Sequence, residues 1–332
     1  MKVSDFDYHL PPELIAQEPL PDRSASRMLV VHRSTGVFED RHFRDLPSYL
    51  TPGDCIVLNN SKVFPSRLFG QRHTGGKVEV FLLKQLEPQL WTALVKPGRS
   101  LQPGAQILFN EQLTAEVVDR AELGERTIRF HGPIPIEDLL DRIGHIPLPP
   151  YIKRTDDRAD HERYQTVYAE HKGSVAAPTA GLHFTPEILE QCQAQGADVA
   201  PVTLHVGLGT FQSLTTDEVS EVKLHSERYE ISPESAVKMR QAKRLIAIGT
   251  TSLRTIESAG VAAGSGDTAL FISPGYRFKH TGALLTNFHL PSTSLLLLVA
   301  AFAGTDLTKQ AYAHAVQRRY RFYSYGDCML VL

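Results

Sequence analysis

The feature that most constrains the fold is an abrupt change of residue pattern near residue 67, which reverses near residue 150. Between these points the chain carries runs of β-branched and aromatic residues, such as KVEVFLL, LWTALVKP and RTIRF, separated by glycine and proline. Short strands spaced by about 8–12 residues, with almost no helical period, are typical of a small barrel or sandwich. We therefore predict that residues 67–149 form a small β-barrel or β-sandwich domain.

The chain on either side of this unit has another pattern. After residue 150 helical and strand patterns alternate, with helices expected at 185–196, 232–244, 250–260, 292–304 and 306–320 and strands at 198–206 and 245–249. Such alternation indicates an α/β fold. The prediction is a mixed α/β main domain, made of residues 1–66 and 150–332, into which this β unit is inserted.

Composition excludes several classes of protein. The longest apolar run, Leu295 to Gly304, is half of the ~20 residues that a membrane span needs, so it is predicted to be a buried helix. The three cysteines are far apart and form no Cys-x-x-Cys pair, which argues against a zinc cluster or a disulfide framework. The first residues contain no apolar signal core, so we expect a cytoplasmic protein without membrane or metal partners. The net charge of −2 gives no overall basic field for nucleic acid.

The stretch RLIAIGTTSLRTIES predicts an anion site. An apolar strand runs into Gly249, and Thr250, Thr251 and Ser252 then open a helix. Free N–H groups and hydroxyls at a helix N-terminus favour a carboxylate or phosphate, and Arg254 one turn later could clamp it. The alternative is ordinary capping of the helix with a surface arginine.

Two further stretches predict close approach of the backbone to a ligand. TLHVGLGTFQ carries Gly207 and Gly209 after a strand, with His205 beside them, but no helical pattern follows at once as a dinucleotide-binding loop would need. In the stretch SVAAPTAGLHF, several small residues precede His183, and small residues let the backbone approach a ligand closely. For each histidine a structural role is the alternative to catalysis.

Polar residues also gather before the buried helix in GALLTNFHLPSTSLLLL. Asn287 and His289 lie there, on a predicted loop held by an apolar scaffold, where binding sites tend to be found. The alternative is a capped helix with a loop histidine that only has a structural role. The sequence LNNSK after another buried strand, with Asn59 and Asn60, could equally be a turn.

Three short clusters alternate basic and aromatic residues: YIKRTDDR, GYRFKH and RRYRFYSYG. This combination suits contact with phosphate and stacking on bases. From the last two clusters the candidate RNA-binding residues are Arg277, Lys279, Arg318, Arg319 and Arg321. A solvated charged face is the better explanation of each cluster when it is taken alone.

Four stretches in this order, SVAAPTAGLHFTPEIL, HVGLGTFQ, AIGTTSLRTIES and GALLTNFHLPSTSLLLLVAAFAG, closely resemble the S-adenosylmethionine:tRNA ribosyltransferase-isomerase family of queuosine biosynthesis. The two ends of the chain resemble it as well. The resemblance implies an α/β domain interrupted by a small β-barrel. It also implies a transferase that moves the ribosyl carbons of S-adenosylmethionine onto 7-aminomethyl-7-deazaguanine at the wobble position of a tRNA with a GUN anticodon. The products would be epoxyqueuosine-tRNA, adenine and L-methionine.

The resemblance places the site at these motifs. It implies S-adenosylmethionine as a co-substrate, no metal, and a monomer. Within it we expect His183 or His205 as the base that removes a proton. The expected substrate-binding residues are Thr179, Gly181, Gly207, Gly209, Thr250, Thr251, Ser252, Arg254, Asn287 and His289. The rival functions are an S-adenosylmethionine-dependent tRNA methyltransferase and an RNA-binding protein without catalytic activity.

Overall fold

The computed structural model describes residues 1–121, 124–207, 214 and 216–332. The chain packs into two compact units, and each is described by itself. The main unit comprises residues 1–62, 149–154 and 163–332, and the other comprises residues 63–148 and 155–162.

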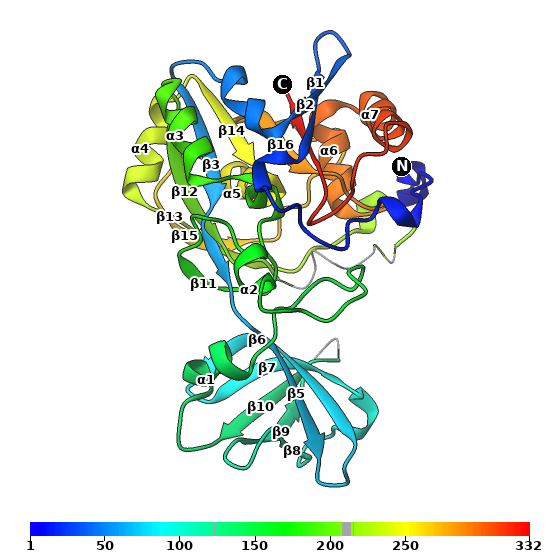
Figure 1. The fold of residues 1–332 in the computed structure, drawn as a ribbon, viewed down its shortest axis with the longest axis vertical. Coiled ribbons are helices and arrows are strands. Elements are labelled where there is room, and N and C mark those ends of the chain that lie inside the picture. The colour runs from blue at the N-terminus through cyan, green and yellow to red at the C-terminus, as the bar shows by residue number, and fades with distance from the viewer. Residues whose placement is uncertain (122–123, 208–213, 215) are drawn as a thin grey trace. The chain divides into compact units, whose positions relative to one another are not determined.

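The second unit contains a closed six-stranded barrel in the order β10-β7-β6-β5-β8-β9 (Figure 1). Neighbouring strands whose register is described are antiparallel, and β9 pairs with β10. The strands are β5 (Arg67–Arg72), β6 (Lys77–Glu87), β7 (Leu90–Lys96), β8 (Gln106–Leu108), β9 (Thr114–Arg120) and β10 (Arg126–His131). Alternate residues such as Val78, Val80 and Leu82 are buried, as the sequence pattern predicted. Helix α1 (Ile136–Ile143) follows the barrel, and α2 (Asp160–Arg163) lies in the return to the main unit.

The main unit is built on a nine-stranded mixed sheet in the order β15-β13-β12-β3-β14-β16-β17-β1-β2 (Figure 1). These strands are β1 (Arg27–His32), β2 (Val37–His42), β3 (Asp54–Asn59), β12 (Asp198–Leu204), β13 (Glu227–Ile231), β14 (Arg244–Ile248), β15 (Gly264–Thr268), β16 (Thr281–Asn287) and β17 (Cys328–Val331). A separate short pair joins β4 (Ser61–Val63) and β11 (His171–Ser174). The mixed α/β domain with a β-barrel is thus confirmed.

Helices and hydrophobic clusters cover both faces of this sheet. In β14 the side chains of Leu245 and Ala247 belong to one cluster, and those of Ile246 and Ile248 belong to the other. This alternation follows from the period of two in a strand. The first cluster includes residues of α4 (Pro233–Gln241), α5 (Gly249–Ala259), α6 (Ser294–Ala303) and α7 (Thr305–Gln317). The second includes residues of α3 (Pro186–Ala194) and of the 3-10 helix η4 (Phe43–Tyr49).

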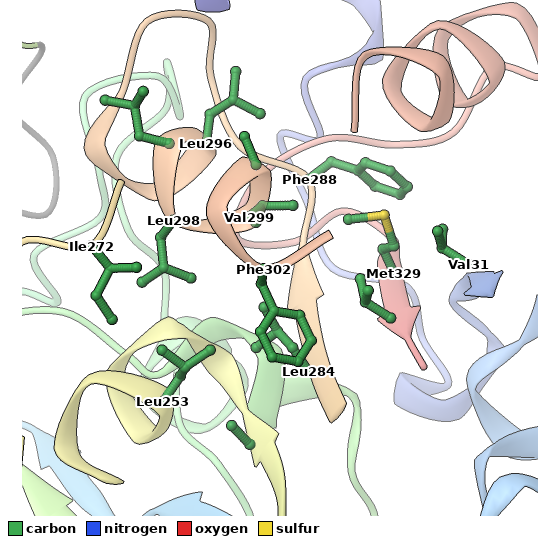
Figure 2. Close-up of a cluster of buried hydrophobic side chains, with 14 of the residues drawn as sticks. Val31, Leu253, Ile272, Leu284, Phe288, Leu296, Leu298, Val299, Phe302 and Met329 are labelled. Carbon is green, nitrogen blue, oxygen red and sulfur yellow. The ribbon is translucent and has the colours of Figure 1, made fainter. Parts of the chain in front are cut away.

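The predicted apolar helix is α6, and it is buried in the first cluster. Figure 2 shows Leu298, Val299 and Phe302 of this helix among side chains from α5, β16 and β17. A helix that is apolar on every side belongs in a core. In the part of the chain that the structure describes, no helix has both the length and the apolar character needed to cross a membrane.

Candidate functional site

Four parallel strands bring the sequence motifs to one edge of the main sheet. Strands β12, β3, β14 and β16 are neighbours and run in the same direction. Their carboxyl ends are Leu204, Asn59, Ile248 and Asn287. Ligands of open α/β sheets bind in the crevice outside such strand ends. The motifs that follow these strands are therefore placed where a ligand would bind.

A pocket of about 780 Å³, counted with the open space at its mouth, lies at this edge. We call it the main pocket. Three motif segments line it, residues 176–180, 249–251 and 286–290, together with Tyr151, Val206, Thr293, Leu295, Tyr323 and Ser324. The first and third segments, which are 106 residues apart in the sequence, thus line the same pocket.

The small residues of the first segment allow two backbones to approach each other. Gly249 begins α5 with φ +85°, a conformation that residues with a Cβ rarely adopt. A Cβ built on Gly249 would be 3.6 Å from the Cβ of Ala180. Both residues line the main pocket. The segment 176–180 therefore forms a wall of small side chains against the start of α5.

The N-terminus of α5 faces the main pocket. Thr250 and Thr251 line it and are nearly fully buried, and the Oγ1 of Thr251 accepts a 3.4 Å hydrogen bond from Asn59 Nδ2. Ser252 is fully buried but is not among the lining residues, and its Oγ has no partner in the described part of the chain. The helix N-terminus gives the pocket a partial positive charge that favours an anionic or electron-rich group.

Asn287 connects the main pocket to His183. Its Oδ1 is 3.2 Å from His183 Nε2, and its Nδ2 donates to the carbonyl oxygens of Tyr323 at 2.8 Å and Ser324 at 3.3 Å. Asn287 lines the main pocket, whereas His183 lines a separate pocket that also contains Arg23. Because Asn287 Oδ1 can only accept, His183 Nε2 carries the proton. His183 thus contacts the main pocket through Asn287.

The surroundings of His183 favour its neutral form. The side chain is buried and its ring lies 5.3 Å from that of Phe43. Burial lowers the pKa of His183 to about 4; the bond to Asn287 opposes this shift, and the charges of Arg23 and Arg321 add to it. A buried imidazole loses the water that would stabilise its charge.

Among the described residues, His289 is the histidine that lines the main pocket. Its Nε2 is 2.8 Å from Thr286 Oγ1, and its backbone N–H donates to the hydroxyl of Tyr312 at 3.0 Å. Burial lowers the pKa of His289 to about 3. It is thus a neutral hydrogen-bonding group at physiological pH.

His205 is placed differently. It is half-buried and is not among the residues that line the main pocket, although the next residue, Val206, is. Its Nδ1 is buried without a hydrogen-bond partner among the described residues. Burial lowers the pKa of His205, and the charges of His171 and Arg228 add to this shift.

Arg254 and Gly207 line a second pocket, of about 460 Å³ with its mouth, which shares Leu295 with the main pocket. The guanidinium of Arg254 forms a buried ion pair with Glu227, and the N–H of Gly207 donates to Glu227 Oε1 at 2.9 Å. Gly209 lies outside the described residues. The structure therefore separates Arg254 from Thr250 and Thr251, although all three are on α5.

Of the remaining predicted residues, Thr179 lines the main pocket and Gly181 does not. A Cβ on Gly181 would be 2.1 Å from the hydroxyl of Tyr168. Gly181 is thus required by packing beneath the pocket wall.

The candidate RNA-binding residues differ in exposure. Arg277, Lys279, Arg318 and Arg319 are exposed, and Arg321 is half-buried with its guanidinium bonded to the carbonyl of Glu18. The interleaved aromatic residues are packed inward: Tyr276 and Phe278 lie against the first hydrophobic cluster, and Tyr320, Phe322, Tyr323 and Tyr325 are buried. Stacking of bases on these rings, which the sequence suggested, is therefore not supported.

Several residues of the site were missed from the sequence. Asn59 was considered only as part of a turn, yet its Nδ2 donates to Leu204 O at 2.9 Å and its Oδ1 accepts from Leu204 N at 3.1 Å, which joins the ends of β3 and β12. Glu227 gave no signal because its strand was not predicted. Among the described residues there is no group of three or more His, Cys, Asp or Glu side chains that could hold a metal ion.

Comparison with known proteins gives a consistent result over the whole chain. The model of the family described as queuosine biosynthesis protein matches residues 3–331. S-adenosylmethionine:tRNA ribosyltransferase-isomerases of Solibacter usitatus and Symbiobacterium thermophilum are 60% and 51% identical, with full coverage of both chains in each case. The crystal structure of S-adenosylmethionine tRNA ribosyltransferase from Thermotoga maritima aligns with a TM-score of 0.56 at 39% identity, covering 99% of this chain and 100% of that chain.

Proposed function

The chain belongs to the queuosine biosynthesis protein family, and we propose that the main pocket is where it carries out the S-adenosylmethionine:tRNA ribosyltransferase-isomerase reaction of its relatives. The observation that carries this proposal is the convergence of residues 176–180, 249–251 and 286–290 on one pocket at the strand ends. The protein is an enzyme of the transferase class that modifies tRNA. We propose S-adenosylmethionine as a co-substrate, with no permanently bound cofactor, and a cytoplasmic monomer.

The proposed acceptor is the 7-aminomethyl-7-deazaguanine base at the wobble position of a tRNA with a GUN anticodon. The sulfonium of S-adenosylmethionine acidifies the hydrogens on C5′, so a base can remove one of them. Expulsion of adenine opens the sugar, and the aminomethyl nitrogen adds to it. Closure of a cyclopentane ring and formation of the epoxide release L-methionine. The products are epoxyqueuosine-tRNA, adenine and L-methionine.

The main pocket suits this chemistry in two respects. Its wall of small residues, 176–180, lets a ligand lie close to the backbone and leaves little room for water, which would attack the opened sugar. Thr250, Thr251, Thr286 and His289 provide hydroxyl and imidazole groups for the hydroxyls of a ribose. We propose that these residues bind the nucleoside part of the donor.

The two histidines expected as bases take different roles in this proposal. His183 is a positioning residue, because it contacts the main pocket through Asn287. His205 is retained as the proposed base on account of its neighbour Val206, which lines the main pocket, although His205 itself does not. Burial lowers its pKa and therefore favours the neutral form that a base requires, and its Nδ1 has no partner among the described residues. Turnover at the wild-type rate after His205→Ala would exclude this role.

The fate of the donor's carbons tests the reaction. The protein would be incubated with modified tRNA and S-adenosylmethionine labelled either in the ribosyl carbons or in the methyl group. We expect the ribosyl label in tRNA and the methyl label in free methionine. Methyl label in tRNA would instead identify a methyltransferase.

The exposed cations Arg277 and Lys279 are proposed to contact tRNA phosphates, and Arg318, Arg319 and Arg321 are proposed to extend this contact. The backbone N–H of Lys279 donates to Glu257 at 2.9 Å, which anchors the segment while its basic side chains face solvent. Because each phosphate contact releases counterions, binding then weakens as salt rises.

Replacing both Arg277 and Lys279 with alanine is expected to lower the slope of log affinity for tRNA against log salt by about 1.5, since each contact contributes about 0.7–0.9. The KM for S-adenosylmethionine should not change. Lys309→Ala, an exposed lysine on α7, is the control and should keep the wild-type slope. An unchanged slope in the double variant would show that these cations do not contact tRNA.

A further inference from the structure

The second pocket contains a pair of opposite charges that the proposed chemistry has not used. Glu227 and Arg254 are 7% and 6% exposed, and they form an ion pair within the pocket lining. Glu227 Oε1 also accepts from Gly207 N at 2.9 Å, and Arg254 Nε donates to Leu270 O at 3.1 Å. Arg254 Nη2 is buried and has no hydrogen-bond partner among the described residues. A buried donor without a partner is costly, and a ligand could supply the acceptor.

A helix N-terminus lies beside this pair. Ser294 and Leu295, the first two residues of α6, line the second pocket, and the helix has ten residues. Their N–H groups belong to the first turn, where backbone donors lack partners within the helix. The rest of the lining is mainly apolar and includes Leu224, Phe271 and Leu298. The second pocket thus offers a positive donor set, a carboxylate and an apolar wall.

We propose that the second pocket binds the amino-acid end of S-adenosylmethionine, an inference that rests on the proposed function. The carboxylate of the ligand is held by Arg254 Nη2 and the N-terminus of α6. The ammonium is held by Glu227, and the methylene groups pack against the apolar wall. Leu295 lines both pockets, so the nucleoside in the main pocket and the amino acid in the second pocket meet beside this residue.

The charges distinguish this ligand from others. A phosphate would be repelled by the carboxylate of Glu227, and adenine carries no charge that would need a buried ion pair. A zwitterion can bind both members of the pair, because its carboxylate can contact Arg254 and its ammonium can contact Glu227. The amino-acid end of the donor has this charge pattern.

The test compares two ligands that differ in the amino-acid part. S-adenosylhomocysteine and 5′-deoxy-5′-methylthioadenosine are both thioethers of the same nucleoside, and only the first carries the amino acid. Equilibrium dialysis with the full chain should show S-adenosylhomocysteine binding about 10- to 100-fold more tightly, as expected for charge-assisted hydrogen bonds. In Glu227→Gln and Arg254→Lys this difference should shrink to about threefold or less, with the affinity for methylthioadenosine unchanged.

Two further variants keep the test decisive. Glu257→Gln changes a different buried glutamate, which is on α5 and lines neither pocket, and should preserve the wild-type difference. Leu224→Trp fills the second pocket from a half-buried position and should weaken only S-adenosylhomocysteine, even if the charge variants do not fold. Equal affinities of the wild-type protein for both ligands, or equal losses of both in Leu224→Trp, would overturn the proposal. Failure of the proposed function would differ, because modified tRNA would then receive no ribosyl label.

Discussion

Asn287→Leu is expected to lower kcat by about 100-fold or more, because a displacement of about 1 Å in a catalytic site has an effect of that size. Leucine matches asparagine in shape but removes the bonds to His183 Nε2 and to the carbonyls of Tyr323 and Ser324. Tyr323 and Ser324 line the main pocket, so the wall that they form loses its hydrogen bonds to Asn287. Single-turnover kinetics with saturating donor and modified tRNA would measure the effect.

The same substitution should lower the free energy of unfolding. It leaves the N–H of His183 and the carbonyl of Ser324 without their partners, and both residues are more than 90% buried, whereas the carbonyl of Tyr323 keeps its bond from Gly326 N at 2.9 Å. Each such group costs about 1–3 kcal/mol, so the loss from the two groups is about 2–6 kcal/mol. Urea unfolding measures it separately from turnover.

A double-mutant cycle with His183→Ala separates positioning from direct catalysis. If His183 acts through Asn287, the double variant should turn over within a few-fold of Asn287→Leu alone. His183→Gln, whose amide can still donate to Asn287 Oδ1, should recover part of the activity lost in His183→Ala. If the fold reductions in turnover of the two single variants multiply in the double variant, His183 acts on the substrate itself.

Acidification from pH 7.5 to pH 5 is expected to lower the free energy of unfolding by about 4 kcal/mol through His183 and His289. Burial holds the pKa of these groups at about 4 and about 3, below the ordinary value of 6.5. Below pH 6.5 the unfolded chain therefore binds protons that the folded chain does not. The free energy of unfolding is therefore highest above pH 6.5 and decreases as the pH falls. At pH 5 each histidine has lowered it by about 2 kcal/mol.

Urea unfolding at the two pH values, followed by far-UV circular dichroism, measures this loss. Helices α3 to α7 all belong to the main unit, so the signal reports mainly on the part that contains both histidines. His289→Gln should remove about half of the pH dependence, whereas the exposed control His9→Gln should leave it unchanged. Equal stability of the wild-type protein at both pH values would contradict burial of the two imidazoles.

The sequence was sufficient to predict elements whose pattern is local. The apolar run 245–249 followed by threonines gave the β14–α5 junction, and the apolar residues 295–304 gave α6. Strands β13 and β15 were missed because little in them is apolar: β15 is GSGDT and is mostly exposed. Strand β15 is the edge of the sheet and β13 lies between β15 and β12, so both are defined mainly by the neighbours with which they pair.

The parts of the site that were missed depend on contacts distant in sequence. His183 and Asn287 are 104 residues apart, and Arg254 and Glu227 are 27 apart. No local sequence pattern indicates that an asparagine lies between His183 and the main pocket. None indicates that Arg254 has an acidic partner. In the segment RRYRFYSYG, the prediction that the aromatic side chains face RNA was wrong, because they are buried. Alternating basic and aromatic residues occur in buried segments as well as on RNA-binding surfaces.

Product analysis shows whether this chain transfers the ribosyl carbons of its donor. The protein would be incubated with S-adenosylmethionine and tRNA carrying 7-aminomethyl-7-deazaguanine, and the small molecules would be separated and quantified. We predict adenine and L-methionine in equal amounts, and only when the modified tRNA is present. Release of S-adenosylhomocysteine, or tRNA binding without consumption of the donor, would contradict the account.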